Sequence, residues 1–292
     1  MGKNTDRAQY SAHNAQGSAQ HRAHDAQDRL YSEQHRLYSA QDMVRIRSSE
    51  CAGCGACCRG MGDTIVLDPY DVWQLVGGTG RTFEELMGAG IDLHVEEGVI
   101  LPHLMMREDT GGCSFLAKDG KCAVHAYRPG ICRLFPLGRE FHDGGVSYFI
   151  VPEGCVKGGL SKVRIEKWLG IADLPRYERF KGEWHLLVQR LRARLAAEPS
   201  DEVRRNVNVY FLQTFYMTPY GGVTAEGGLS AAGGPSAAGG LSAAGGSSAA
   251  GGPSATGGSS VAGGLSVAGC PSAAAFYEEF AGRRTAFEAA VL

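Results

Sequence analysis

The chain has 292 residues with 29 basic and 31 acidic side chains, which gives a formal net charge of −2. This balance lacks the basic excess typical of nucleic-acid-binding proteins and argues against nucleic acid as a partner. No run approaches the ~18 apolar residues of a membrane span, so a membrane partner is not expected either. The 42 glycines are concentrated late in the chain, which indicates that the folded part is smaller than the whole.

Residues 1–43 are polar and are rich in Ala, Gln, His, Ser and Arg. They contain no apolar stretch of the kind found in a signal peptide, and they offer too little apolar surface to fold alone. We therefore expect a disordered arm here and a cytoplasmic location, where thiols stay reduced or bind metal.

Four cysteines follow within eight residues, with the spacing C-x2-C-x2-C-C, at Cys51, Cys54, Cys57 and Cys58. A C-x2-C step places two sulfurs on one side of a tight turn, which is a typical arrangement for thiolate metal sites. A disulfide framework is the alternative, but it requires an oxidising compartment. The spacing therefore predicts a metal site.

The next segments alternate short helices and hairpins. Asp68-Pro69 and Thr82-Phe83-Glu84-Glu85 are helix-start signals, and residues 99–106 form an apolar run that Pro102 restricts to an edge strand. The turn pair Asp119-Gly120 predicts a hairpin that brings Cys113 toward Cys122. Such a hairpin would carry two further thiols of the metal-binding region.

Two more cysteines complete this region. Arg128-Pro129 is expected to open a short helix that contains Cys132 and ends at Pro136. A second hairpin, residues 139–141 with 146–151 around Asp143-Gly144-Gly145, leads to Cys155. The cationic side chains near these cysteines have two interpretations, which are charge compensation of the thiolates and, for Arg128 and Arg133, anion binding.

The C-terminal third is predicted to be helical and then repetitive. Helices are expected over residues 163–169, 175–197 and 201–216, because leucines and aromatic residues recur at three- and four-residue steps. Hexapeptide units such as GGLSAA and GGPSAA fill residues 227–274, and a sequence of this kind predicts a flexible linker. Residues 275–292 then read as an amphipathic helix that returns to the domain.

The partition of the thiols stays open at this stage. In an extended backbone the adjacent Cys57 and Cys58 point to opposite faces, so one of them is expected to serve a second site. Eight thiolates would fill two tetrahedral zinc sites or two iron–sulfur clusters, and one site plus structural thiols is the alternative. His125 is a further candidate ligand, although we expect an ordinary histidine there, and Cys270 is excluded because it replaces a glycine of the repeat.

The identity of the metal is also left undetermined by the spacing. The C-x2-C-x2-C run with a remote fourth cysteine resembles the ligand pattern of bacterial ferredoxins, which hold a four-iron cubane cluster. The hairpin that carries Cys113 and Cys122 fits zinc equally well. The expected cofactor is therefore zinc or iron, and spacing alone does not decide between them.

Three motifs together resemble the YkgJ-type cysteine-cluster family. They are the C-x2-C-x2-C-C run, Cys113-Ser-Phe-Leu with Gly120-Lys-Cys122, and Tyr127-Arg-Pro-Gly-Ile-Cys132-Arg-Leu-Phe-Pro136. The resemblance covers about residues 51–155 and implies a zinc- or iron-chelating domain. The family includes proteins similar to flagellin lysine N-methylases, which implies an alternative function as an iron–sulfur-dependent protein lysine N-methyltransferase. No glycine-rich strand–turn–helix loop for S-adenosylmethionine appears in the cysteine domain.

The sequence thus predicts an α+β, mostly α fold with a small cysteine-rich metal-binding core, short hairpins and covering C-terminal helices. The expected organisation is a disordered arm (1–43), a cysteine-cluster domain (44–220), a repeat linker (221–274) and a final helix (275–292). The leading function is metal binding, with an iron–sulfur enzyme and a structural zinc module for interaction with another protein as alternatives. The predicted metal ligands are Cys51, Cys54, Cys57, Cys58, Cys113, Cys122, Cys132 and Cys155.

Overall fold

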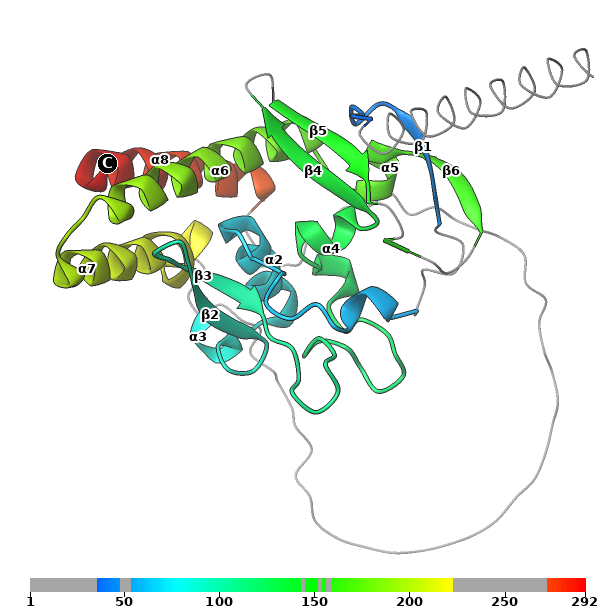
Figure 1. Ribbon diagram of the computed structural model, residues 1–292, viewed down its shortest axis with the longest axis horizontal. Coiled ribbons are helices and arrows are strands. Elements are labelled where there is room, and N and C mark those ends of the chain that lie inside the picture. The colour runs from blue at the N-terminus through cyan, green and yellow to red at the C-terminus, as the bar shows by residue number, and fades with distance from the viewer. Residues whose placement is uncertain (1–35, 48–53, 143–144, 152–153, 156–158, 223–271) are drawn as a thin grey trace, which may run out of the picture.

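The computed structural model describes residues 36–47, 54–142, 145–151, 154–155, 159–222 and 272–292. Its fold is α+β and mostly α, as the sequence predicts (Figure 1). Within these residues the strands form three separate two-stranded antiparallel sheets, β1–β6, β2–β3 and β4–β5. The first 35 residues of the predicted arm and nearly all of the predicted repeat linker lie outside the described residues.

The described part of the chain begins at residue 36, within the predicted arm, and it pairs with distant segments. Strand β1 (Met43–Arg47) pairs with β6 (Leu160–Arg164), and its alternate residues Val44 and Ile46 are buried. Tyr38 also exchanges two backbone hydrogen bonds of 2.8 Å with Tyr148. Local composition cannot predict these strand pairings, because the partner residues lie more than a hundred residues further along the chain.

Two hairpins form the other sheets. β2 (Ile91–Glu96) pairs with β3 (Val99–Leu104) across a turn in which Glu97 and Gly98 have φ of 50° and 85°. β4 (Leu137–His142) pairs with β5 (Gly145–Ile150). The sequence predicts β3 and the β4–β5 hairpin, but it does not predict β2.

Short helices connect these hairpins. α2 (Pro69–Thr79) begins with a capping box in which the Asp68 carboxylate accepts the Asp71 N–H at 2.8 Å, and α3 (Phe83–Leu86) begins with the same motif at Thr82. Such caps satisfy backbone N–H groups that have no partner inside the helix. The remaining short helices are η1 (Ala56–Cys58), η2 (His125–Tyr127), α4 (Gly130–Leu134) and α5 (Ile165–Leu169).

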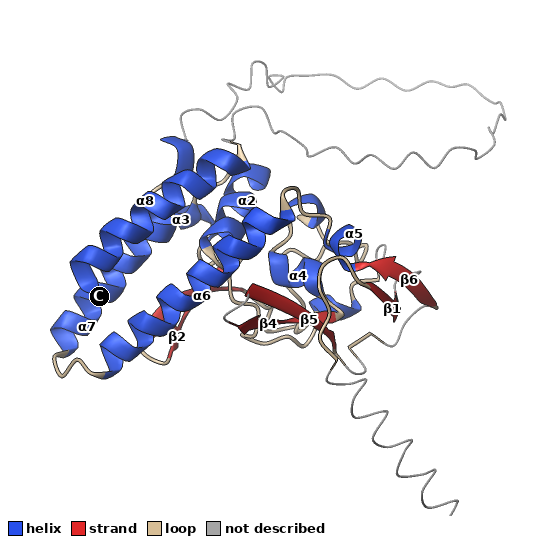
Figure 2. Ribbon diagram, turned by 90° about the horizontal axis from the view of Figure 1, so that it is seen from above, coloured by secondary structure: helices blue, strands red, loops and turns tan. Residues whose placement is uncertain are grey.

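Long helices lie side by side at one end of the molecule, away from the β1–β6 pair (Figure 2). Their aromatic rings form a core in which Phe211, Phe215, Phe280 and Phe287 are at most 1% exposed. Trp184 contacts the first three of these rings at centroid distances of 5.4–6.2 Å. The helices concerned are α6 (Leu174–Ala196), α7 (Asp201–Leu212), the π-helix η3 (Gln213–Met217), η4 (Tyr220–Gly222) and α8 (Ala273–Val291).

The last helix, α8, is held by polar contacts as well as by its rings. The Arg283 guanidinium donates to the carbonyl oxygens of Thr214, Thr218 and Pro219 at 2.7–2.8 Å. These carbonyls include ones at the C-terminal end of η3, where acceptors lack helical partners. Arg190 of α6 also pairs with Glu288 at 2.8 Å. A single arginine thus joins α8 to the end of the α7–η3 helix.

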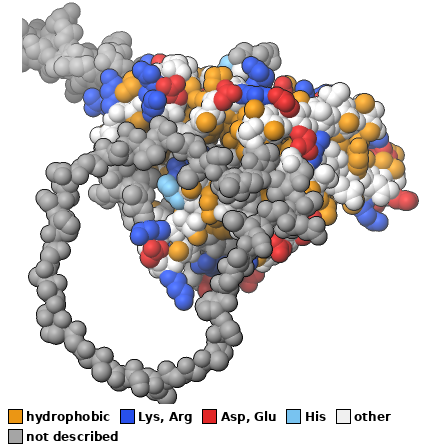
Figure 3. Space-filling model, turned by 180° about the vertical axis from the view of Figure 1, so that it is seen from behind, with side chains coloured by type: hydrophobic (Ala, Val, Ile, Leu, Met, Phe, Trp, Pro, Cys, Tyr) orange, Lys and Arg blue, Asp and Glu red, His pale blue; other side chains and the backbone are white. Residues whose placement is uncertain are grey.

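Acidic and basic side chains are interspersed on the face of the molecule seen from behind (Figure 3). Among the helices that the structure describes, none combines the length and apolarity that a membrane crossing requires.

Candidate metal centre

The first thiols of the centre are carried by η1, where Cys57 and Cys58 are consecutive residues of a 3-10 turn. The turn follows Gly55, which has a left-handed φ of 61°. A Cβ atom at this position would lie 2.7 Å from the carbonyl oxygen of Gly120. Glycine is therefore required both for the backbone angle and for the close approach of the 117–121 turn. This approach brings the first cluster toward Cys122.

The next two thiols come from the loop after β3. The Cys113 N–H donates to the Cys58 carbonyl at 2.8 Å, and Leu116 forms a bridge with Cys122. The predicted turn at Asp119-Gly120 is present, although the flanking residues make isolated bridges rather than a regular hairpin. Cys113 is 7% exposed, whereas Cys122 is partly buried.

Cys132 reaches the same region from α4. The start of this helix is fixed by α2, because the Gly130 N–H donates to the Asp71 carboxylate at 2.7 Å. Gly130 also lies so close to Tyr177 that a Cβ atom would be 2.0 Å from the phenol oxygen. The predicted helix around Cys132 is thus confirmed, and a buried carboxyl and a glycine determine its position.

The five thiols line one cavity of about 690 Å³. They come from three separate sequence segments, which are η1, the 113–122 loop and α4. The cysteines that line it are Cys57, Cys58, Cys113, Cys122 and Cys132. Cys54 and Cys155 are partly exposed and are not among the lining residues, and Cys51 lies outside the described residues.

The adjacent pair lies on one cavity, whereas the sequence analysis expects the two side chains to point to opposite faces. Cys57 and Cys58 both line the cavity, and the Cys58 thiol hydrogen-bonds the Cys57 sulfur. The expectation assumed an extended backbone, in which neighbours point to opposite faces, whereas the observed backbone is a 3-10 turn. One shared site is therefore compatible with both thiols.

The electrostatics of the cluster favour a bound cation. The hydrogen bond from Cys58 lowers the pKa of Cys57 to about 6. The same hydrogen bond, together with burial and the neighbouring thiols, raises the pKa of Cys58. Burial raises the pKa of Cys113, Cys122 and Cys132. Thiolates at these positions repel one another in a medium that solvates them poorly, and a metal ion would offset both costs.

The residues present fit a thiolate-bound metal in donor chemistry and in their common cavity. In the part of the chain that the structure describes, no three His, Cys, Asp or Glu side chains are arranged as a ready metal-holding group. Soft sulfur donors suit zinc, iron and iron–sulfur clusters. The assignment of ligands therefore rests on the convergence of the five thiols.

Cationic residues lie beside the thiols. The positive charge of Arg128 contributes to lowering the pKa of Cys57, and it also opposes the effect of burial on Cys122. Arg128 contacts the Nε2 atom of His125, and burial followed by the charges of Arg128 and Arg133 lowers the pKa of this exposed histidine. Arg133 instead donates to the carbonyl oxygens of Arg128 and Ala126, at 3.1 and 2.5 Å. Arg128 thus has the contacts of a charge-compensating residue, and Arg133 has those of a loop-fixing residue.

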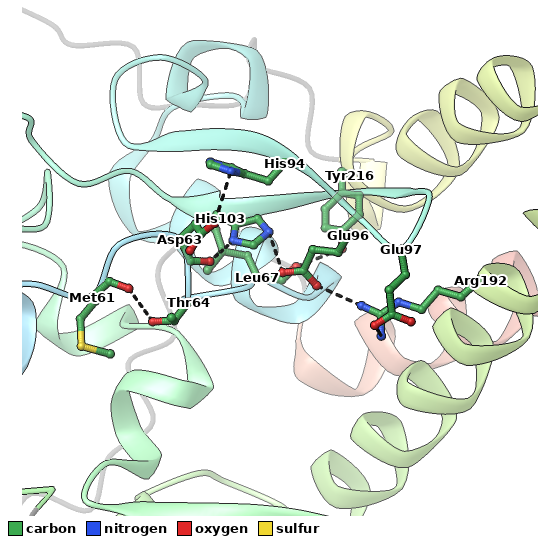
Figure 4. Close-up of polar contacts among 10 residues, drawn as sticks. All are labelled: Met61, Asp63, Thr64, Leu67, His94, Glu96, Glu97, His103, Arg192 and Tyr216. Atoms are coloured by element: carbon green, nitrogen blue, oxygen red, sulfur yellow. Dashed lines mark hydrogen bonds and ion pairs between the residues drawn. The ribbon is translucent and has the colours of Figure 1, made fainter. Parts of the chain in front are cut away.

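A polar network borders the same cavity further from the thiols (Figure 4). His103, which is 1% exposed, contacts the Asp63 carbonyl through Nδ1, and its Nε2 lies 3.4 Å from the Glu96 carboxylate. The Arg192 guanidinium pairs with Glu96 at 3.0 Å and with Glu97 at 3.5 Å. The sequence analysis assigned no role to His103, and its burial on β3 could not be read from ligand spacing.

The buried ion pair Lys181–Asp68 also borders the cavity, with side-chain exposures of 13% and 2%. The sequence analysis recognised Asp68 only as a helix cap and did not single out Lys181. A signal was present, because Lys181 follows Tyr177 by four residues on the apolar face of α6. A lysine on a buried helix face usually has a carboxylate partner.

Comparison with known families gives one match. Residues 50–148 match the family CxxCxxCC, described as "Putative zinc- or iron-chelating domain". This segment, about a third of the chain, is similar to that domain. The matched segment contains all five cavity-lining cysteines and ends within β5, whereas α6, α7 and α8 lie beyond it. Searches of curated proteins and of solved structures give no match.

Proposed function

We propose that the protein binds zinc or an iron–sulfur cluster through a centre built on Cys57, Cys58, Cys113, Cys122 and Cys132. The observation that carries the proposal is the convergence of these thiols, from three separate segments, on one cavity. Cys51, Cys54 and Cys155 are proposed as further ligands, because the same region of sequence contains them. When bound, the metal would supply cross-links between loops, or electron transfer if it is an iron–sulfur cluster.

An enzymatic function is the second candidate, and the size of the cavity favours it. A structural zinc site is closed by its four ligands and needs no space beside them. Here the thiols occupy one part of a cavity of about 690 Å³, which is within the size range of small-molecule sites. An iron–sulfur-dependent transferase, such as a lysine N-methyltransferase, is the specific form of this candidate.

Anaerobic purification followed by metal and sulfide analysis tests the proposal. Iron and sulfide with broad absorption near ~400 nm would identify clusters, and colourless protein with stoichiometric zinc would identify a zinc centre. The variants Cys113→Ser and Cys132→Ser should lower the metal content. The matched control Cys270→Ser should not, because Cys270 belongs to the repeat. Unchanged metal content in both of the first two variants would contradict the assignment.

Binding of labelled S-adenosylmethionine by the metal-loaded protein tests the second candidate. Saturable binding at one equivalent would support the transferase. Its absence from a protein that retains its full metal content would leave the binding function and exclude this form of enzyme.

A further inference from the structure

Arg139 of β4 has an unusual position in the cavity wall. Its guanidinium lies between the rings of Tyr148 and Tyr177, 6.0 and 5.5 Å from their centroids. Its Nε and Nη2 atoms are buried, and no acceptor has hydrogen-bond geometry toward either of them. The phenol oxygens of Tyr148 and Tyr177 are close enough to interact with the guanidinium electrostatically. No ion pair joins it to a carboxylate of the described residues. Buried donors without acceptors are costly, and a buried cation without a partner is more so.

The neighbouring cations of α6 already have ion-pair partners. Lys181 is paired with Asp68, and Arg192 is paired with Glu96. The Glu178 carboxylate accepts the Tyr148 hydroxyl at 2.5 Å, and the buried Asp71 carboxyl accepts the Gly130 N–H, rather than a bond from Arg139. Among the cations that line the cavity between β4 and α6, Arg139 is therefore the one without an ion pair to a carboxylate of the described residues.

The two unpartnered nitrogens also define the shape of the missing acceptor. Nε and Nη2 lie on the same edge of the planar guanidinium, so their N–H bonds are nearly parallel. This edge matches the two oxygens of a carboxylate in a bidentate arrangement. A single carbonyl or hydroxyl oxygen would satisfy only one of the two donors.

The surrounding wall is suited to an organic group rather than to water. Leu137 and Phe141 of β4, Trp168 after β6 and Val188 of α6 line the cavity. The imidazole of His185 stacks on Phe141 with centroids 4.3 Å apart, and it also lines the cavity. Apolar walls with a few fixed polar groups are typical of small-molecule sites.

We propose that the cavity binds a small organic carboxylate, which pairs side-on with Arg139 and places its apolar body between β4 and α6. The proposal uses none of the thiols, and it does not depend on which metal they bind. Arg139 is a binding residue in this proposal.

Calorimetric titration of the full-length, metal-containing protein tests the site with three probes of one shape. Phenylacetate should bind saturably, and the neutral phenylacetamide should bind at least tenfold more weakly. The variant Arg139→Gln should lose at least tenfold in affinity for phenylacetate without a change for the amide. The control Arg179→Gln removes an exposed arginine of α6 and should match the wild type. Phenyl phosphate binding more tightly than phenylacetate would overturn the assignment to a carboxylate.

A second measurement avoids dependence on the variant and on the shape of the probe. In the wild-type protein, the Arg139 Nε–H signal in a ¹⁵N-resolved NMR spectrum should shift saturably when acetate is added. Absence of this shift, or equal phenylacetate affinity in wild type and folded Arg139→Gln, would overturn the proposal. If Arg139 pairs in solution with a carboxylate of its own chain, acetate will not shift its Nε–H signal.

Discussion

The two ends of the molecule are stabilised in different ways. The helical region (α2, α6, α7, η3 and α8) buries complete aromatic rings, with Phe211, Phe215, Phe276 and Phe287 fully inaccessible to solvent. The cysteine region (residues 54–66 and 105–135) consists of 3-10 turns, isolated bridges and one short helix. Its buried apolar side chains are few, namely Ile65, Leu116, Val124 and Leu134 beside Cys113. Both regions contribute to one hydrophobic core, but the helical region contributes whole aromatic rings and the cysteine region only a few side chains. Under the proposed function, metal bound by the thiols would supply the missing stabilisation of the cysteine region.

The largest expected difference between the two regions is their response to metal removal. Chelation under reducing conditions should abolish amide protection in residues 54–66 and 105–135, because the metal supplies most of the free energy that orders such loops. Protection in α6, α7 and α8 should persist. Hydrogen-exchange mass spectrometry checks both regions in one experiment. Full protection of the cysteine region in metal-free protein would contradict the proposed dependence.

The helical region should instead respond to loss of a ring. Phe280→Ala removes a side chain that is 1% exposed and that lies 4.7 Å from Phe180, centroid to centroid. We expect the free energy of unfolding to fall by about 3–5 kcal/mol in urea denaturation. Leu186→Ala is the control on α6, where a leucine that is 63% exposed should contribute no more than about 0.5 kcal/mol. A loss below about 1 kcal/mol for Phe280→Ala would show that α8 does not form part of the core.

Asn208 joins α7 to the β2–β3 hairpin. Its side-chain oxygen accepts the Ile100 N–H at 2.8 Å, and its amide donates to the Gly98 and Arg204 carbonyls at 3.0 Å. Asn208→Ala leaves buried backbone groups without partners and should cost about 1–3 kcal/mol. Asn206→Ala on the exposed face of the same helix should have little effect. Equal stabilities of the two variants, measured by thermal unfolding, would argue against this connection.

Asp71 provides a pH-dependent link between the two regions, because it belongs to α2 and accepts from Gly130 of α4. Burial, followed by the nearby charge of Asp68, raises the pKa of Asp71 to about 7. A raised pKa means that folding favours the protonated form. The resulting stability is present below the unfolded pKa of about 4 and is lost as pH rises through 7.

Between these pH values the stability of wild type relative to Asp71→Asn should fall by at most about 1.4 kcal/mol per pH unit. Urea unfolding at several pH values measures this slope. Asp109→Asn, which changes an exposed carboxyl in the cysteine region, should leave the wild-type slope unchanged. A pH-independent difference between wild type and Asp71→Asn would contradict the raised pKa.

Sequence motifs of a few residues correctly predicted those helix starts and strands that depend on neighbouring residues alone. The caps at Asp68 and Thr82, the edge position of Pro102 and the helix around Cys132 follow from nearby residues, and all are present. The pairing of β1 with β6 was not predicted, because it joins segments over a hundred residues apart. β2 was missed although its sequence alternates Ile91, Leu93 and Val95 with polar residues, which is the period-2 pattern of a strand.

The candidate site was predictable in composition but not in geometry. Spacing identified the thiols, whereas the 3-10 turn that directs Cys57 and Cys58 into one cavity depends on the approach of Gly120 to Gly55. Arg139, one of the cationic side chains near the cysteines in sequence, lies beside two tyrosine rings in the structure. Which cations remain without partners depends on three-dimensional pairing, and no sequence pattern records it.

The pairing of β1 with β6 has a consequence for the chain between them. Arg47 and Leu160 face each other across this sheet, so the segment that holds the cysteines leaves and returns at neighbouring points. A segment with adjacent ends can be inserted into a surface loop of an unrelated host without forcing the host apart. The pair of strands therefore marks the points at which the cysteine-bearing segment could be joined to a host, provided that α6, which packs against it, is carried along.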